Sequence, residues 1–96
     1  MIGNILKLIR YVNNDMSTKE VADKMGVRIS YVCDIESGRK NVTMNTLQKF
    51  SNIYNIPVST ILLFDELQTK NNLTRIETLK NIVEYYINNV EKEKTR

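Results

Sequence analysis

The fold is decided by residues 17–38, which read Ser-Thr-Lys-Glu-Val-Ala-Asp-Lys-Met-Gly-Val-Arg-Ile-Ser-Tyr-Val-Cys-Asp-Ile-Glu-Ser-Gly. Ser17 and Glu20 have the spacing of a capping box, in which each side chain bonds the backbone amide of the other residue. We therefore expect a helix over residues 18–25. Gly26 follows where a helix ends in the left-handed conformation, which costs glycine little and other residues more.

A second short helix is expected directly after this turn, over residues 29–36, with Ser37-Gly38 ending it. Val32 and Ile35 are spaced to face inward. Ala22 in the first helix is small enough to let the two helices cross at close range. The stretch therefore predicts two short helices that pack across a glycine turn.

This arrangement resembles the helix-turn-helix of DNA-binding proteins, and among them the Cro/phage-repressor (XRE) family. That family has a small residue in the first helix, a glycine in the turn and two branched apolar residues in the second helix. These four places are held by Ala22, Gly26, Val32 and Ile35. Residues 35–39, Ile-Glu-Ser-Gly-Arg, are similar to the Ile-Glu-x-Gly-basic signature of the family. The resemblance covers about residues 3–66 and implies an all-α fold, with a five-helix phage-repressor-like DNA-binding domain.

Length and composition argue against several other classes of protein. Ninety-six residues suit one small domain, and the apolar runs are too short for a transmembrane span or a secretory signal. Cys33 is the only cysteine, which fits the reducing cytoplasm, and we expect it to be a small packed residue rather than a reactive thiol. Because the chain has no histidine, no nucleophile–base pair and no phosphate loop, we expect no zinc site, no catalytic residues and no cofactor.

The basic excess of the chain lies in the part that resembles a DNA-binding domain. Residues 1–64 carry eight basic and five acidic side chains, whereas residues 65–96 carry six of each. The net charge of +3 therefore belongs wholly to the first part. A positive surface suits DNA, although the same excess is common on surfaces that only face solvent.

Two further helices are expected to flank the central pair. Residues 3–13 carry an apolar face, and the resemblance implies that Arg10 pairs with Glu36. That ion pair would tie the first helix to the end of the helix over residues 29–36. Residues 43–54 are expected to form a helix that Thr43 is placed to cap, with apolar side chains that suit the core and part of a dimer seam.

A fifth helix is expected over residues 58–67, because Pro57 suits the start of a helix and the residue before it avoids helical geometry. The side chains of this helix expected in the core are Ile61, Leu62 and Phe64. The DNA-binding domain is then expected over residues 1–67, followed by a polar linker over residues 68–73.

The remaining residues, 74–96, are expected to form an additional C-terminal amphipathic helix opened by a capping box of Thr74 and Glu77. Its apolar stripe consists of Ile76, Leu79, Val83, Tyr86, Ile87 and Val90. A single helix of this kind is unstable alone in water, so the stripe must pack on something. We favour a second copy of the chain, which makes this helix a dimerisation element. The alternatives are the chain's own domain and a different protein.

Residues on the helix over 29–36 are the candidates for reading bases. Ile29, Ser30 and Asp34 point away from the core together, because residues one, four and five apart share a side of a helix. The resemblance implies that these positions face base edges in the major groove. Ser30 can donate or accept a hydrogen bond, and Ile29 can contact a thymine methyl group. Asp34 can accept from a cytosine amino group, discriminate against wrong bases, pair with the preceding helix or simply face solvent.

Contacts to phosphates are expected on both sides of this helix. The free backbone amides at the start of the helix over residues 18–25 suit an anion. Tyr31 can either reach a phosphate or cover the seam between the two helices of the pair. The complete set of expected phosphate contacts is Ser17, Thr18, Lys19, Arg28, Tyr31, Arg39, Lys40 and Asn41.

The sequence thus predicts a cytoplasmic, sequence-specific regulator of transcription that binds double-stranded DNA. We expect a repressor that binds a roughly palindromic operator as a homodimer, with two reading helices about 34 Å apart. The alternative is a protein-interaction module, like an antitoxin or antirepressor, whose C-terminal helix docks on another protein. An enzyme is poorly supported.

Overall fold

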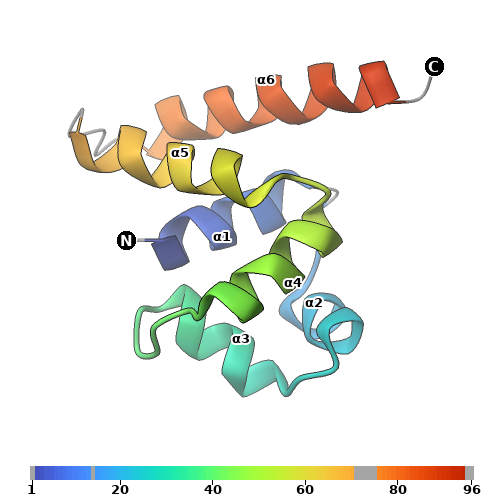
Figure 1. The fold of residues 1–96 in the computed structure, drawn as a ribbon, viewed down its shortest axis with the longest axis vertical. Helices are drawn as coiled ribbons and strands as arrows, with labels where there is room; N and C mark the ends of the chain where they lie inside the picture. Colours follow the sequence, from blue (N-terminus) through green and yellow to red (C-terminus); the bar gives the residue numbers. More distant parts are fainter. Residues whose placement is uncertain (1, 14, 71–75, 95–96) are drawn as a thin grey trace.

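The computed structural model describes residues 2–13, 15–70 and 76–94, and side chains within 2–13, 15–69 and 80–89. These residues form six helices and no strand, which confirms the all-α prediction (Figure 1). The helices are α1 (Ile2–Val12), α2 (Thr18–Met25), α3 (Ile29–Glu36), α4 (Met44–Tyr54), α5 (Val58–Lys70) and α6 (Ile76–Lys94).

Helix α1 lies at the centre of the fold, between α3 and α4 on one side and α5 and α6 on the other (Figure 1). It contacts all four of these helices. Ile5, Leu6 and Ile9 are completely buried, because positions three and four apart fall on one face of a helix. The two ends of the molecule are therefore held together through the apolar face of α1.

The first turn of α1 packs directly against the end of α3. A Cβ atom at Gly3 would overlap the backbone oxygen of Ile35 and approach that of Glu36 to 3.0 Å. Only a residue without a side chain lets the two backbones come this close. Nothing in the local sequence shows this requirement, because α3 lies about thirty residues further along the chain.

Replacement of Gly3 by alanine should therefore lower the free energy of unfolding, by about 1–3 kcal/mol, because a methyl group must push the two helices apart. Urea denaturation followed by circular dichroism measures this loss. Asn4→Ala is the matched control, since Asn4 is exposed on the same turn and its replacement should leave stability nearly unchanged. Equal stability of the Gly3 and Asn4 variants would contradict the close approach.

A buried ion pair links α1 to α3, as the resemblance implies. Arg10 Nε donates to Glu36 Oε2 at 2.8 Å, and Arg10 Nη2 donates to Glu36 Oε1 at 3.0 Å. Arg10 Nη1 also donates to the carbonyl oxygen of Met16 at 2.9 Å, just before α2 begins. Both charged residues are only 6% exposed. The hydrogen bonds to Glu36 raise the pKa of the Arg10 guanidinium, against the opposing effect of burial. The pair thus fixes the end of α3 and the approach to α2 relative to α1.

Helix α5 departs from the prediction in two ways. It continues to Lys70, so residues 68–70, predicted to be linker, are helical. The rest of that predicted linker, and the capping box at Thr74, lie outside the described residues. Leu62 is 41% exposed, so its predicted burial was wrong. Ile61 and Phe64 are buried as predicted, because they are three residues apart and share one side of α5, the helix that packs against α1 and α6.

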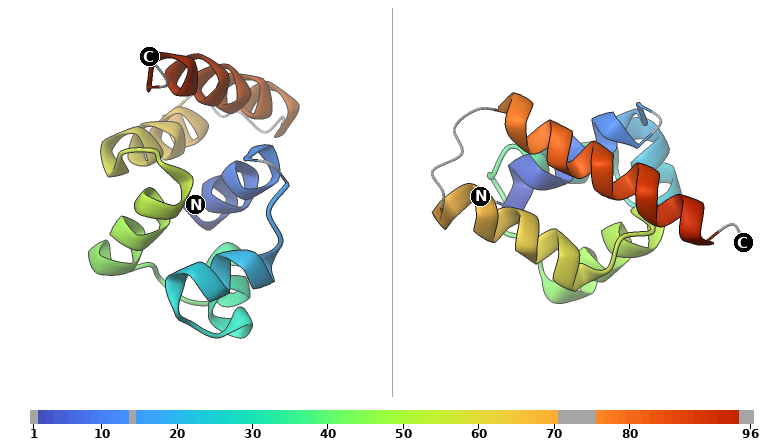
Figure 2. Two further views of the ribbon diagram at one scale, coloured as in Figure 1. Left: turned by 90° about the vertical axis from the view of Figure 1, so that its right-hand side faces the viewer. Right: turned by 90° about the horizontal axis from the view of Figure 1, so that it is seen from above.

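Helix α6 packs on its own domain, against α1 and α5 (Figure 2). Val83 and Ile87 are buried in the core, and the ring of Tyr86 meets the ring of Phe64 edge-on, with centroids 5.7 Å apart. A second copy cannot reach Val83 and Ile87 while α6 stays in this place. Their assignment to a dimer seam is therefore corrected: these side chains lie in the core of the same chain, where α6 meets α1 and α5. The other stripe positions, Ile76, Leu79 and Val90, have side chains outside the described part of the chain.

Candidate nucleic-acid interface

The turn between α2 and α3 is built as its sequence predicts. Ser17 Oγ accepts from the backbone amide of Glu20 at 3.1 Å, and the amide of Ser17 donates to Glu20 Oε1 at 3.3 Å. Gly26 has a left-handed φ of 70°, and the amide of Val27 bonds back to the carbonyl of Ala22 at 3.0 Å. The predicted bounds of α2 and α3 are confirmed, and local hydrogen bonds hold the turn between the two helices.

Helix α3 buries one side and exposes the other. Val32, Ile35 and Glu36 are buried, whereas Ile29 is 44% exposed and Ser30 is exposed, as predicted. Cys33 is also exposed, so its prediction as a packed residue was wrong. The four-residue spacing from Ile29 places the thiol on the outward side, and that spacing was a signal that the sequence already contained. We call this surface the outward face of α3; it comprises Ile29, Ser30, Cys33, Asp34 and Ser37.

Asp34 is half-buried at the edge of the outward face. Its Oδ1 lies 3.9 Å from Nη1 of Arg39, in the loop that follows α3. Ion pairs as exposed as this one contribute little to stability, so the interaction mainly offsets the negative charge of Asp34. The partner of Asp34 in this ion pair is Arg39, in the loop after α3. The predicted pairing of Asp34 with α2 is therefore not observed in the described part of the chain.

Tyr31 takes a structural role between α3 and α4. Its hydroxyl lies 3.0 Å from Oγ1 of Thr46, and Lys40 Nζ lies 5.3 Å from the centre of its ring. The hydroxyl of Tyr31 thus links α3 to α4, and its cover over the seam of α2 with α3 stays a prediction. Its hydroxyl is already engaged by α4, and this argues against the alternative of a phosphate contact.

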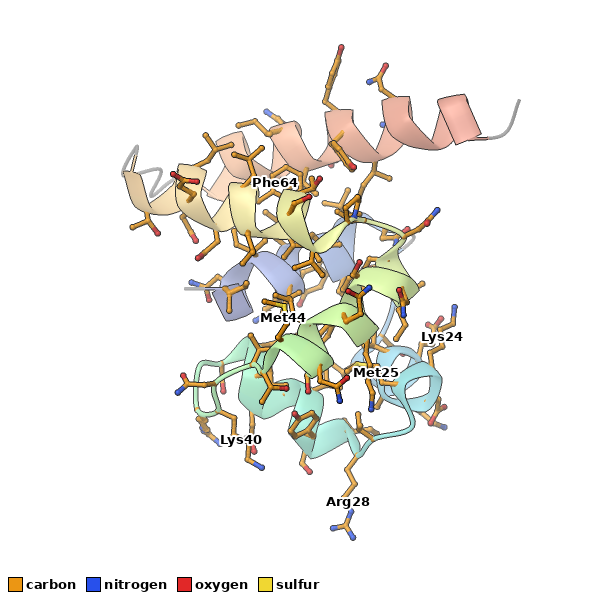
Figure 3. All side chains as sticks on the ribbon, in the orientation of Figure 1. Lys24, Met25, Arg28, Lys40, Met44 and Phe64 are labelled. Atoms are coloured by element: carbon orange, nitrogen blue, oxygen red, sulfur yellow. The ribbon has the colours of Figure 1, made fainter. Side chains whose placement is uncertain are left out.

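Several of the predicted phosphate-contacting residues come together near α3. Arg28 is the N-cap residue of α3, makes no capping hydrogen bond through its side chain and is exposed. Figure 3 shows Arg28 and Lys40 at the end of the molecule opposite to α6. Arg39 and Asn41 are exposed in the same loop as Lys40. The remaining predicted contacts lie at the start of α2, where Ser17 is the N-cap and Thr18 and Lys19 are the first two helical residues.

An open hollow of about 430 Å³ lies between the turn, α3 and α4, beside the outward face. Arg28 and Lys40 line it, together with Lys49 from α4, which was not among the predicted phosphate contacts. Lys49 lies nine residues beyond Lys40, in a helix interpreted from the sequence as core and part of a dimer seam. Its position beside α3 is set by the packing of α4, so no local pattern identifies it.

The fold and this surface define a class: a compact helical domain that presents one helix of a helix-turn-helix beside basic side chains. The model of a helix-turn-helix family matches residues 6–61, more than half of the chain. The chain therefore belongs to the Cro/C1-type (XRE) helix-turn-helix family and is a DNA-binding transcriptional regulator. No curated protein and no solved structure matches it significantly.

The described residues show neither a membrane segment nor a metal-binding cluster. Among them, no helix combines the length and the apolar character needed to cross a bilayer. Nor do they contain a group of three or more acidic, cysteine or histidine side chains arranged to hold a metal ion.

Proposed function

We propose that this protein is a sequence-specific repressor that acts in the cytoplasm and binds a roughly palindromic operator as a homodimer. One observation carries the proposal: α3 buries Val32 and Ile35 but leaves its outward face uncovered, beside the exposed cations of Arg28 and Lys40. A helix fits the major groove of B-DNA, and cations beside it neutralise phosphates. A domain seated in the major groove blocks other proteins from the same stretch of DNA, so we assign repression to occlusion of the operator.

Base reading is assigned to the outward face. Ser30 supplies a hydrogen-bonding hydroxyl, Ile29 supplies an apolar contact for a thymine methyl group, and Asp34 can accept from a cytosine amino group. Thr18 and Lys19 occupy the first turn of α2, where unpaired backbone amides attract a phosphate. Phosphate contacts set the position on the duplex, whereas Ser30 and Ile29 set the preferred sequence.

The proposal is tested by selecting duplexes from random DNA and measuring how the preferred duplex protects Cys33. This thiol is the only one in the chain and lies on the outward face, so it reports on that surface directly. Its alkylation by a maleimide should slow in proportion to the fraction of protein bound, because the groove wall covers it. The same duplex at high salt is the control, since binding weakens as salt rises. An unchanged alkylation rate in a saturated complex would show that another surface meets DNA.

The position of α6 limits how two copies can read one duplex. Figures 1 and 2 place α6 at one end of the molecule and α3 at the other, with α4 and α5 along one side. A copy docked on the outer surface of α6 would turn the two α3 helices in opposite directions. We therefore assign the dimer seam to the side of α4 and α5. The large apolar side chains exposed on that pair of helices are Met44, Leu62 and Leu63.

Replacement of Leu63 by glutamate should convert the dimer to a monomer, because it places a charge in an apolar seam. Size-exclusion chromatography with light scattering measures this. Tyr85→Glu is the control, since Tyr85 is 71% exposed on α6 and should not affect the dimer. Dissociation of the Tyr85 variant, with an intact dimer for the Leu63 variant, would move the seam to α6.

A second candidate function is supported by the exposed apolar side chains of α6. Ile82 and Tyr85 are exposed while the neighbouring Val83 and Ile87 are buried. We infer that these two side chains could contact a different protein that docks on α6. The chain would then be a protein-interaction module of the antitoxin or antirepressor kind. A monomer that still binds its operator, together with specific capture of one protein by α6, would favour this function.

A further inference from the structure

The hollow beside α3 gathers positive charge from three separate parts of the chain. Arg28 comes from the turn before α3, Lys40 from the loop after it and Lys49 from the middle of α4. Among the described residues that line it, Asp34 carries the one carboxylate, which lies 3.9 Å from Arg39. Like charges brought together repel each other, and an anion among them removes that cost. The hollow is therefore a place where an anion is stabilised.

Two of the residues that line the hollow, Tyr31 and Thr46, belong to a short series of hydrogen-bonded hydroxyl groups. The hydroxyl of Tyr31 lies 3.0 Å from Oγ1 of Thr46, which accepts in turn from Oγ1 of Thr43 at 3.0 Å. Thr46 is buried, so these bonds fix α4 against α3. Lys49 follows Thr46 by three residues and therefore lies on the same side of α4. The packing that positions Tyr31 thus also directs Lys49 towards the hollow.

We propose that the hollow seats a phosphate of the DNA backbone and that Lys49 is a DNA-contacting residue on α4. The inference rests on the proposed function, because it requires α3 to enter the major groove. The phosphate is held by Arg28, Lys40 and Lys49, and the bond between Tyr31 and Thr46 keeps the hollow open. An anchor beside the outward face limits the rotation of α3 in the groove, and so places Ser30 against the bases. Lys49 itself carries no sequence information, because every nucleotide has the same phosphate.

The test compares Lys49→Gln with Lys80→Gln in the full chain, on the duplex obtained by selection. Lys80 is an exposed lysine on α6, at the end of the molecule opposite to α3, and is the matched control for a lost positive charge. Loss of one phosphate contact should reduce the salt slope of log K by about 1. Between about 50 and 200 mM salt, the wild type should lose about 3-fold to 4-fold more affinity than the Lys49 variant. The Lys80 variant should keep the full slope, and the order of preferred sequences should be the same for all three proteins.

A second measurement locates the phosphate. Neutral methylphosphonate linkages are placed one at a time along the duplex, and the affinity of each protein is measured. One linkage should lower the affinity of the wild type but should not lower that of Lys49→Gln any further. Two results overturn the inference while leaving the proposed function intact. One is a full salt slope for the Lys49 variant when Arg39→Gln shows a reduced slope. The other is the lack of any linkage whose effect depends on Lys49. A wild-type protein that binds no duplex at low salt defeats the proposed function, and the inference with it.

Discussion

Replacement of Glu36 by alanine should lower the free energy of unfolding by about 3–5 kcal/mol, the largest effect we expect from any single change. The loss is large because Arg10, only 6% exposed, would keep a buried charge without its partner. A small domain is stable by only about 5–15 kcal/mol, so a substantial fraction of this variant should be unfolded in mild denaturant. Urea denaturation followed by circular dichroism measures the loss.

The double variant Arg10→Met with Glu36→Leu is the control for this first prediction. It removes both charges and leaves apolar side chains of similar size, so it should be far more stable than the single variant. DNA binding by the folded double variant should show whether the pair also orients α3. A single variant within about 1 kcal/mol of the wild type would mean that water reaches the Arg10 site.

The second large effect is expected at Ile87, in the part of α6 that docks on the domain. Ile87→Ala should cost about 2–4 kcal/mol, because it leaves a cavity between α6 and the helices α1 and α5. Ile82→Ala is a matched control on the same helix, since Ile82 is exposed and its replacement should cost much less. Thermal and urea unfolding both measure the difference.

The concentration dependence of this loss separates packing within one chain from packing between copies. If Ile87 belongs to the core of one chain, the stability lost by Ile87→Ala is the same at every protein concentration. If Ile87 instead packed between two copies, dilution would dissociate them and remove the contribution of Ile87 to the free energy of unfolding. A loss that disappears on dilution would restore the dimer seam first expected for this stripe.

Most of the helix boundaries were predictable because they depend on neighbours in the chain. The capping box of Ser17 and Glu20, the left-handed Gly26 and the cap at Thr43 each act within three or four residues. Their hydrogen bonds form as soon as the local backbone turns, whatever the rest of the chain does. The bounds of α2 and α3 were therefore right, and α4 begins directly after its predicted cap.

Exposure was less predictable, because it depends on which distant helix covers a given face. Leu62 has the apolar character of a core residue, yet it is exposed because α1 meets the opposite face of α5. Cys33 was placed in the core by its residue type, although its four-residue spacing from Ile29 indicated the outward face. Periodicity identifies the residues that share a side of a helix, but not always the side that is covered.

The sequence by itself determined the central helix pair, the family and the outward residues Ile29, Ser30 and Asp34, because these follow from spacing within one short stretch. Only the tertiary structure decided what covers the stripe of α6, why position 3 must be glycine and that Lys49 lies beside α3. Each of these depends on two segments far apart in the chain that meet only when the core forms. Such meetings are set by the packing of whole helices, and no spacing within a single helix records them.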